Sequence, residues 1–290
     1  PFGIPTEPLP SKEALGFRVP LYGFDQWCSL FSHRQLMALG TFLRISRTVP
    51  KAMVRSGYST EWTETVLGYL ALMLDRLTNQ CSAFSRWNQG GEKIEGTFAR
   101  FALPILWDFG EVNPLSATSG AYLSALEWVS LVVKHLVSAT NKAPSPTVSC
   151  RSAIEDTGGT LDGTQDVIIT DPPYYDAIPY SDLMDYFYVW LRRTLADSSG
   201  EIEGVFQQNL GPKWNNALED GELIDDASRH KGDKAKSKSV YETGMARAFQ
   251  SAHRLLKPDG RFVVVFAHKH PDAWETLASA IIRAGFVVEA

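Results

Sequence analysis

The chain has 290 residues, enough for one large domain or two smaller ones, and its 44% hydrophobic content excludes disorder as the overall state. Its net charge of −5 excludes a uniformly basic protein that coats nucleic acid by charge alone. Residues 1–150 contain slightly more basic than acidic side chains, and residues 151–290 contain more acidic than basic ones. A polyanion is therefore expected to contact the first half.

Cysteine spacing and hydropathy exclude further classes of protein. Cys28, Cys81 and Cys150 lie far apart, without the paired spacing of a zinc ribbon or the even number of a secreted disulfide framework. The longest apolar stretch, residues 126–137, contains charged residues and is too short to span a bilayer. No signal peptide is visible, and the first residue is not methionine. We expect a piece of a longer cytoplasmic protein, with no metal in this chain and no membrane partner.

The first half of the sequence predicts a mostly helical region. Residues 1–24 are rich in Pro and Gly and indicate an extended lead-in. Apolar residues then recur at helical intervals over about 25–45, 60–77 and 120–137. We therefore expect a helical insert domain over residues 25–145.

After residue 146 the pattern changes to alternating strands and helices. The run Val167-Ile168-Ile169 is typical of a strand buried in a parallel sheet. Phe187 and Trp190 lie one turn apart on the helix that follows, as in a helix packed against a sheet. The alternation predicts a doubly wound α/β domain over residues 146–290. The expected strands are 148–150, 166–170, 261–267 and 286–288, and the expected helices are 181–195, 240–256 and 273–284.

Two segments are ambiguous from the sequence. Residues 197–240 are polar and glycine-rich, which indicates a long mobile loop that either closes over a substrate or is a disordered linker. Residues 107–114 (WDFGEVNP) mix carboxylates with large aromatic side chains, and either complete a pocket or form a buried polar hinge.

One short motif has recognisable chemistry. Asp171-Pro172-Pro173-Tyr174 follows the predicted strand at 166–170, at the carboxyl end where open α/β sheets bind ligands. An exocyclic amino nitrogen such as N6 of adenine is a poor nucleophile, because its lone pair is delocalised into the ring. The Asp171 carboxylate and the Pro172 carbonyl can accept hydrogen bonds from the NH₂ group and stabilise the charge that develops as it attacks. The motif therefore suits methyl transfer to an amino group.

The remaining residues of the motif support the same interpretation. Pro172 and Pro173 restrict the backbone that aims the acceptors, and Tyr174 offers an aromatic face on which a flipped-out base stacks. Tyr175 and Tyr180 lie in the adjoining loop and are expected to contact the substrate. The alternative is a rigid turn after a strand, which the strand before the motif and the aromatic residues behind it disfavour.

Several blocks of sequence carry a resemblance to a known family. They are residues 30–36 (LFSHRQL), 107–114, 170–176 (TDPPYYD), Tyr180, 187–191 (FYVWL), 257–260 (KPDG), 265–269 (VFAHK) and 273–275 (AWE). In these blocks the chain resembles the adenine-specific DNA methylases, a family that includes zinc-ribbon members and members encoded in phage-defence clusters of the DISARM type. The resemblance covers nearly the whole chain, and residues 107–114 and 170–176 are its most specific parts.

The resemblance implies an S-adenosylmethionine-dependent DNA methyltransferase, with a Rossmann-like class I core and a helical insert that contacts DNA. The expected product is N6-methyladenine, and the expected partners are DNA and other subunits of a defence or restriction-modification system. Family members also carry a Gly-rich loop that holds the cofactor, followed by an acidic residue for its ribose. Neither occurs in these 290 residues, where adjacent glycines stand only at 90–91 and 158–159. The chain therefore holds the catalytic half of a larger site, or its cofactor binding is in doubt.

Weaker candidates complete the predicted site. Ser152 is a candidate for cofactor binding together with Asp171, and alternatively caps the turn that follows it. His268 and Lys269 end a predicted strand at the same sheet edge as Asp171, where they either contact substrate or are solvated. A basic series in the first half suits DNA phosphates, or is a solvated helix face. It comprises His33, Arg34, Gln35, Arg44, Arg47, Lys51 and Arg55.

Other functions remain open at this stage. The same tetrapeptide serves amino methylation of RNA, of cytosine N4 or of a protein glutamine side chain. A protein of another class, a catalytically silent DNA-binding subunit, fits the missing Gly-rich loop but not the intact Asp171-Pro172-Pro173-Tyr174 motif.

Overall fold

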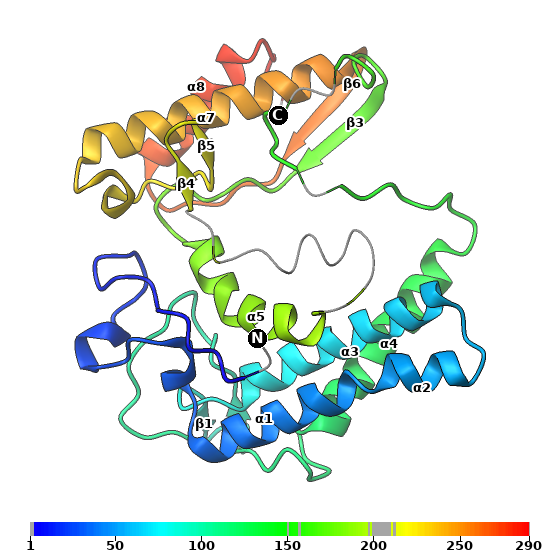
Figure 1. Ribbon diagram of the computed structural model, residues 1–290. Coiled ribbons are helices and arrows are strands. Elements are labelled where there is room, and N and C mark those ends of the chain that lie inside the picture. Colours follow the sequence, from blue (N-terminus) through cyan, green and yellow to red (C-terminus); the bar gives the residue numbers. More distant parts are fainter. Residues whose placement is uncertain are drawn as a thin grey trace. The chain divides into compact units, whose positions relative to one another are not determined.

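The computed structural model describes residues 3–149, 151–155, 158–196, 198, 210 and 213–289 (Figure 1). The chain is mixed α/β and divides into two compact units. The helical unit comprises Pro1–Lys12, Gly16–Pro146 and Asp182–Gly211, and the α/β unit comprises Glu13–Leu15, Thr147–Ser181 and Pro212–Ala290. This grouping differs from the linear division predicted at residue 146, because most of the helix after the Asp-Pro-Pro-Tyr motif belongs to the helical unit.

The helical unit contains the three helices predicted from periodicity, with shifted ends. The expected helix over 25–45 begins at His33, where Ser32 and Gln35 form a capping box: the Ser32 hydroxyl accepts from the Gln35 N–H, and the Gln35 side chain accepts from the Ser32 N–H. A short helix α2 and a β-hairpin were not predicted. The elements are α1 (His33–Ser46), α2 (Val49–Arg55), α3 (Thr60–Gln80), β1 (Arg86–Asn88), β2 (Lys93–Glu95), α4 (Tyr122–Thr140) and α5 (Tyr180–Thr194), with 3₁₀ turns at Val19–Tyr22 and Trp27–Leu30.

Helix α5 supplies the aromatic centre of the helical unit. Trp190 is 1% exposed, and its ring meets Phe31 edge-on at 5.5 Å. Tyr186 is fully buried, stacks on Phe31 at 5.5 Å, and donates its hydroxyl hydrogen to the Thr78 carbonyl at 2.7 Å. Trp190 is therefore a core residue as predicted, but the predicted packing of this helix against a sheet is wrong. Its apolar side is covered by side chains from the first hundred residues, which periodicity cannot identify as its partners.

The α/β unit is built on two parallel strands. Strand β3 (Gln165–Thr170) pairs with β6 (Leu256–Val264), so that Thr170 is opposite Val264. Helices α7 (Lys234–Leu255) and α8 (Pro271–Arg283) pack on each other, and α7 also contacts β6 (Figure 1). A small hairpin, β4 (Trp214–Asn215) with β5 (Asp220–Gly221), and a 3₁₀ turn at Ala227–His230 precede α7. This is a two-stranded parallel sheet, and a doubly wound sheet is not seen in the described residues.

Three predicted elements of the α/β unit are corrected. Residues 286–288 and 148–149 are not strands, and Cys150 lies outside the described residues. Much of the stretch predicted as a mobile loop is structured: it contains β4, β5, the 3₁₀ turn and the first turns of α7. Helix α7 starts early because the Asp233 side chain accepts from the Lys236 N–H at 2.9 Å and caps it. Residues 197, 199–209 and 211–212 of the predicted loop lie outside the described residues.

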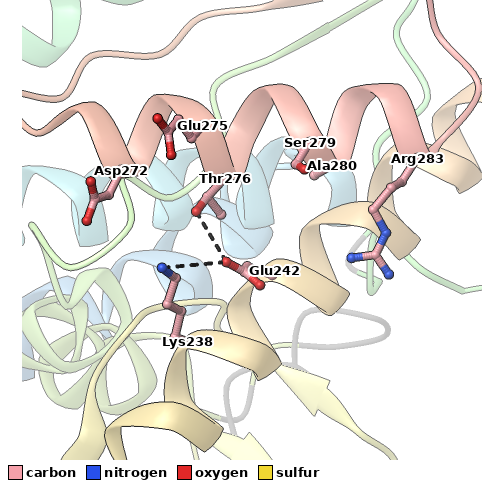
Figure 2. Close-up of a pocket in the computed structure, with 8 residues that line it drawn as sticks. All are labelled: Lys238, Glu242, Asp272, Glu275, Thr276, Ser279, Ala280 and Arg283. Carbon is pink, nitrogen blue, oxygen red and sulfur yellow. Dashed lines mark hydrogen bonds and ion pairs between the residues drawn. The ribbon is translucent and has the colours of Figure 1, made fainter.

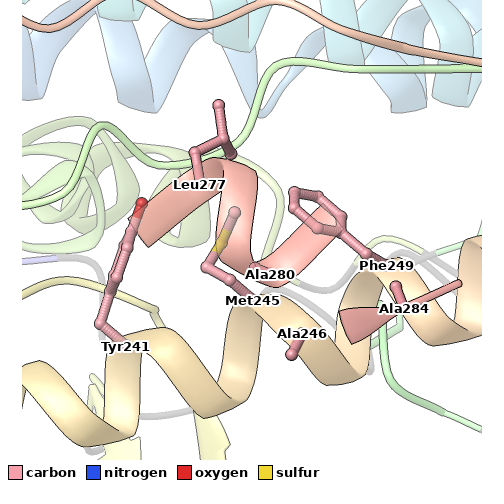
Figure 3. Close-up of a cluster of buried hydrophobic side chains, with 7 residues drawn as sticks. All are labelled: Tyr241, Met245, Ala246, Phe249, Leu277, Ala280 and Ala284. Carbon is pink, nitrogen blue, oxygen red and sulfur yellow. The ribbon is translucent and has the colours of Figure 1, made fainter. Parts of the chain in front are cut away.

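One face of the two-stranded sheet is covered and the other is not. On the covered face, Phe262, Val264 and Phe266 pack against the buried cluster that α7 and α8 form. Figure 3 shows that cluster, with Tyr241, Met245, Ala246 and Phe249 from α7 and Leu277, Ala280 and Ala284 from α8. On the other face, Val167, Ile169, Val263 and Val265 are 43–71% exposed. Parallel strands are normally covered on both faces, so this pair is unusually open.

Stability of the helical unit is expected to depend on pH through Glu7. Burial acts to raise the pKa of Glu7, but the hydrogen bond and charge of Arg193, with the charge of Arg192, hold this pKa below its ordinary 4.5. Arg193 is 6% exposed, and its guanidinium also donates to the carbonyls of Gly3 and Ile4. We expect Arg193→Met to lower the free energy of unfolding at neutral pH by about 3 kcal/mol, because it leaves a buried carboxylate short of a partner.

The sign of the pH effect follows from the lowered pKa. The stabilisation by Glu7 is complete above pH 4.5 and is lost as the pH falls through the lower folded pKa, so the difference between wild type and Arg193→Met should shrink in acid. Urea unfolding between pH 3 and 7 measures this difference. Arg34→Met is the control, since the side chain of Arg34 is 82% exposed in its pair with Glu111, and should cost less than about 1 kcal/mol. A difference for Arg193→Met that does not change with pH would contradict the assignment to Glu7.

Candidate functional site

The predicted motif forms a loop directly after β3, at the carboxyl end of the parallel pair. The Val265 N–H donates to the Thr170 carbonyl at 2.8 Å, so the pairing continues through the last residue of β3 to the start of the loop. Asp171 is exposed and Pro172 is buried. Because the ladder ends at this point, the loop residues must find their hydrogen-bond partners elsewhere.

Asp171 and Tyr174 interact within the loop. The Tyr174 hydroxyl donates to the Asp171 carboxylate, and this hydrogen bond, with some burial and the negative charge of Asp171, raises the pKa of Tyr174 above 10.0. The Tyr174 ring meets Phe266 edge-on at 5.4 Å. Tyr180 lies within electrostatic reach: burial and then the charges of Asp171 and Glu222 raise its pKa. Asp171 and Tyr174 are thus together in the loop, and Tyr180 is near enough for the charge of Asp171 to raise its pKa.

Tyr175 is held by groups of its own unit through its backbone and its side chain. Its φ of 58° lies in the left-handed region, which is uncommon for a residue other than glycine. Its N–H donates to the Tyr241 hydroxyl at 3.3 Å, and its carbonyl accepts from the Asp225 N–H at 3.1 Å. Burial, the charge of Asp225 and a hydrogen bond to that carboxylate raise the pKa of Tyr175. In this structure Tyr175 acts as an anchor of the loop.

His268 is also committed to the loop. Its Nε2 lies 3.1 Å from the Asp176 carboxylate, and its Nδ1 accepts from the His270 N–H at 3.1 Å. An acceptor role for Nδ1 assigns the neutral ring's proton to Nε2, which then donates to Asp176. The ring is 5% exposed, whereas the next residue, Lys269, is exposed. Of the two predicted substrate contacts on this segment, only Lys269 presents its charge to solvent.

Ser152, the predicted cofactor contact, lies in a small turn. Its hydroxyl donates to the Asp220 carboxylate at 2.9 Å and accepts from the Ile154 N–H at 3.4 Å. This matches the alternative considered from sequence, a capping serine. Its partner on β5 was not predicted, because residue 220 lies in the stretch expected to be a loop.

A buried ion pair behind the loop was also missed. Glu222 accepts from the N–H and the hydroxyl of Ser181, at 2.8 and 2.5 Å, and pairs with Arg229 at 2.6 Å. The side chains of Glu222 and Arg229 are about 10% exposed. The pair holds the first turn of α5, next to Tyr180. Sequence offered no signal for it, since both charges lie in a polar stretch without periodicity.

A shallow pocket lies elsewhere on the α/β unit, between α7 and α8. Figure 2 shows its eight lining residues: Lys238, Glu242, Asp272, Glu275, Thr276, Ser279, Ala280 and Arg283. Its volume is about 190 Å³. Glu242 accepts from the Thr276 hydroxyl at 3.4 Å and lies 3.9 Å from the Lys238 ammonium. None of the predicted site residues lines this pocket.

The predicted basic series is only partly available for phosphates. Arg34 pairs with Glu111 at 2.7 Å, Arg47 donates to the Arg193 carbonyl at 2.7 Å, and Gln35 is buried in the capping box of α1. Besides Arg34, the exposed residues of the series on α1 and α2 are His33, Arg44, Lys51 and Arg55. Glu111 also accepts from the Ser32 hydroxyl at 2.6 Å, so the segment 107–114 is tied to the start of α1.

Comparisons with protein-family models, with curated proteins and with solved structures found no match. Among the residues that the structure describes, His, Cys, Asp and Glu side chains do not gather in threes that could hold a metal ion. The described helices include none whose length and hydropathy would let it cross a membrane. The geometry of the loop is therefore the basis on which we infer a function.

The contact between Asp171 and Tyr174 can be tested by titration. Since the hydrogen bond to Asp171 is the main cause of the raised pKa of Tyr174, Asp171→Asn should move this pKa back toward 10.0. Ultraviolet difference titration measures it, with Tyr174→Phe to identify the signal of this residue. Asp176→Asn is the matched control, because it removes a neighbouring carboxylate that bonds His268 instead. An unchanged pKa of Tyr174 in Asp171→Asn would contradict the contact.

Proposed function

We propose that this chain carries the amino-substrate side of an S-adenosylmethionine-dependent DNA methyltransferase that acts on a flipped-out base, with adenine N6 as the target. The observation that carries the proposal is the placement of an exposed carboxylate, Asp171, and the Pro172 carbonyl directly after a parallel strand, beside the ring of Tyr174. The pairing of β3 with β6 through a helical crossover is the element that a Rossmann-like core would need at this position.

The two acceptors suit an amino group. Among the described residues, the Pro172 carbonyl accepts no hydrogen bond, whereas the Pro173 carbonyl accepts from Tyr241 and from the Tyr175 N–H. The Asp171 carboxylate has two oxygens, so it can accept from an NH₂ group while one of them accepts from Tyr174. An NH₂ group that donates one hydrogen to each acceptor is drawn toward the tetrahedral geometry of an attacking nitrogen.

Proton removal needs no strong base in this site. A methylated amino nitrogen would be cationic and strongly acidic, so its proton could leave to water, and Asp171 is needed only as a hydrogen-bond acceptor for the NH₂ group. Tyr174 and the partly exposed Tyr180 are the aromatic side chains next to Asp171 on which a base can stack, and such stacking contributes about 1–3 kcal/mol per base.

The described residues do not form a cradle for the methyl donor. Ser152 is occupied by Asp220 and the Ile154 N–H, and Gly158 and Gly159, although both have positive φ, lie in a turn outside β3. Only the family resemblance implies S-adenosylmethionine as the donor, which would supply the methyl group. Our proposal for this chain is thus limited to binding and activating the amino substrate.

DNA contact is proposed for the exposed basic residues of α1 and α2. Arg44, Lys51 and Arg55 can contact phosphates without breaking an ion pair that the structure shows. Arg34 would first have to leave Glu111. One alternative function is favoured by a specific observation: the missing donor cradle fits a DNA-binding subunit that transfers no methyl group.

The test is methyl transfer from radiolabelled S-adenosylmethionine to DNA, with RNA and protein as competing acceptors. We expect Asp171→Ala to lower kcat at least about 100-fold, because it removes one of the two acceptors that stabilise the developing charge. Asp166→Asn is the matched control: this carboxylate lies on the same strand, but it is 79% exposed and pairs with Lys257, so kcat should be unchanged.

Three other outcomes would change the conclusion. Label in RNA or protein but not in DNA would keep the chemistry and replace the substrate. Equal labelling by wild type and Asp171→Ala would contradict the assignment of Asp171. DNA binding without labelling, abolished when Arg44, Lys51 and Arg55 are replaced by alanine, would support the silent subunit.

A further inference from the structure

Tyr241 lies in the buried cluster of α7 and α8, and its hydroxyl reaches the motif loop. The side chain is 1% exposed, and Figure 3 shows it on α7 with the apolar side chains that surround it. Its hydroxyl donates to the Pro173 carbonyl at 2.8 Å and accepts from the Tyr175 N–H at 3.3 Å. Burial raises its pKa to about 12, so it is protonated and able to donate at neutral pH. One hydroxyl thus holds two backbone groups of the loop.

The two hydrogen bonds of the Tyr241 hydroxyl restrict a loop backbone that could adopt other conformations without them. A left-handed φ is unfavourable for a residue with a Cβ, so Tyr175 needs contacts that hold it in this conformation. Tyr241 supplies one on the amide side, and Asp225 supplies another at the carbonyl. The ring of Tyr175 also meets the Tyr241 ring edge-on at 5.2 Å.

The same hydrogen bonds make the two proline carbonyls of the motif differ, because one is occupied and the other is not. The Pro173 carbonyl accepts from the Tyr241 hydroxyl at 2.8 Å and from the Tyr175 N–H at 3.0 Å, whereas the Pro172 carbonyl has no protein donor among the described residues. The motif contains two neighbouring carbonyls of similar strength, and an amino group that bonded the second would lie away from Asp171. Occupying the second carbonyl leaves the first as the backbone acceptor that works together with the carboxylate.

We propose that Tyr241 is a positioning residue: its hydroxyl fixes the loop so that Pro172 and Asp171 are the acceptors presented to the amino substrate. The proposal rests on the proposed function, but its structural part, that this hydroxyl holds the Pro173 carbonyl and the Tyr175 amide, stands apart from it. Sequence reasoning did not single out Tyr241, because it is one apolar-face residue on a helix 66 positions away from Tyr175.

The experiment uses Tyr241→Phe, which keeps the packed ring and removes only the hydroxyl. Amide hydrogen exchange of Tyr175 should become up to about five- to tenfold faster, because the N–H loses one of its two acceptors and keeps only the Pro173 carbonyl at 3.0 Å. In the methyl-transfer assay kcat should fall about tenfold with KM for DNA unchanged, because no group that touches DNA is removed. The control is Tyr186→Phe, which removes another fully buried hydroxyl, bonded to the Thr78 carbonyl, in the helical unit.

Each outcome decides a part of the proposal. Unchanged exchange of Tyr175 in Tyr241→Phe overturns it. Faster exchange with unchanged kcat overturns the positioning role, and so does an equal fall of kcat in Tyr186→Phe, which would indicate general loss of stability. If the wild-type chain transfers no methyl group, only the proposed function is overturned. The exchange experiment still tests the two hydrogen bonds of Tyr241.

Discussion

The parallel hydrogen bonds between β3 and β6 are the interaction on which the α/β unit depends. They run to the end of β3 and continue to the Thr170 carbonyl, so the motif loop begins at a point where the backbone is fixed on one side. Beyond it no strand among the described residues pairs with the loop, so the peptide groups of the loop depend on side chains and on other loops for their hydrogen bonds. Tyr241 and Asp225 bond backbone groups of the loop, and His268 bonds the Asp176 carboxylate, each from a separate segment of the same unit. The local shape of the candidate site is therefore a product of tertiary contacts added to one rigid strand end.

Buried charge is handled in the same way in both units. Arg193 is surrounded by Glu7 and by the carbonyls of Gly3, Ile4 and Val189, and Glu222 is satisfied by Arg229 and by both polar groups of Ser181. Burying a charge is costly unless its hydrogen bonds are made, so such pairs select one arrangement of segments distant in sequence. The first ties the start of the chain to α5, and the second ties residues before α7 to Ser181 within the α/β unit.

The sheet of β3 and β6 leaves the apolar side chains on one of its two faces exposed. Val167, Ile169, Val263 and Val265 face outward, whereas the alternate residues pack on α7 and α8. In the helical unit, α4 likewise keeps most of its apolar side chains exposed, with Ala125 as its buried residue. Tyr122 stacks on Phe42 at 4.5 Å, and Arg76 lies 4.7 Å above the Trp128 ring, which attaches the helix to its own unit. Exposed patches of this kind mark surfaces that usually contact other groups.

The amino-acid sequence by itself determined the long helices, the strand before the motif and the motif's place at its carboxyl end. Helical periodicity, the Ser32 cap and the β-branched run at 167–169 are local signals, and they need no knowledge of distant partners. Only the tertiary structure decided which unit α5 joins, that 286–288 is not a strand, and that residues 213–240 are largely structured. The same holds for the site: Asp171, Pro172 and Tyr174 were found from their chemistry, whereas Tyr241, Asp225 and Glu222 were not. Their roles come from hydrogen bonds across more than 40 residues of chain, and such pairings leave no periodic trace in a single sequence.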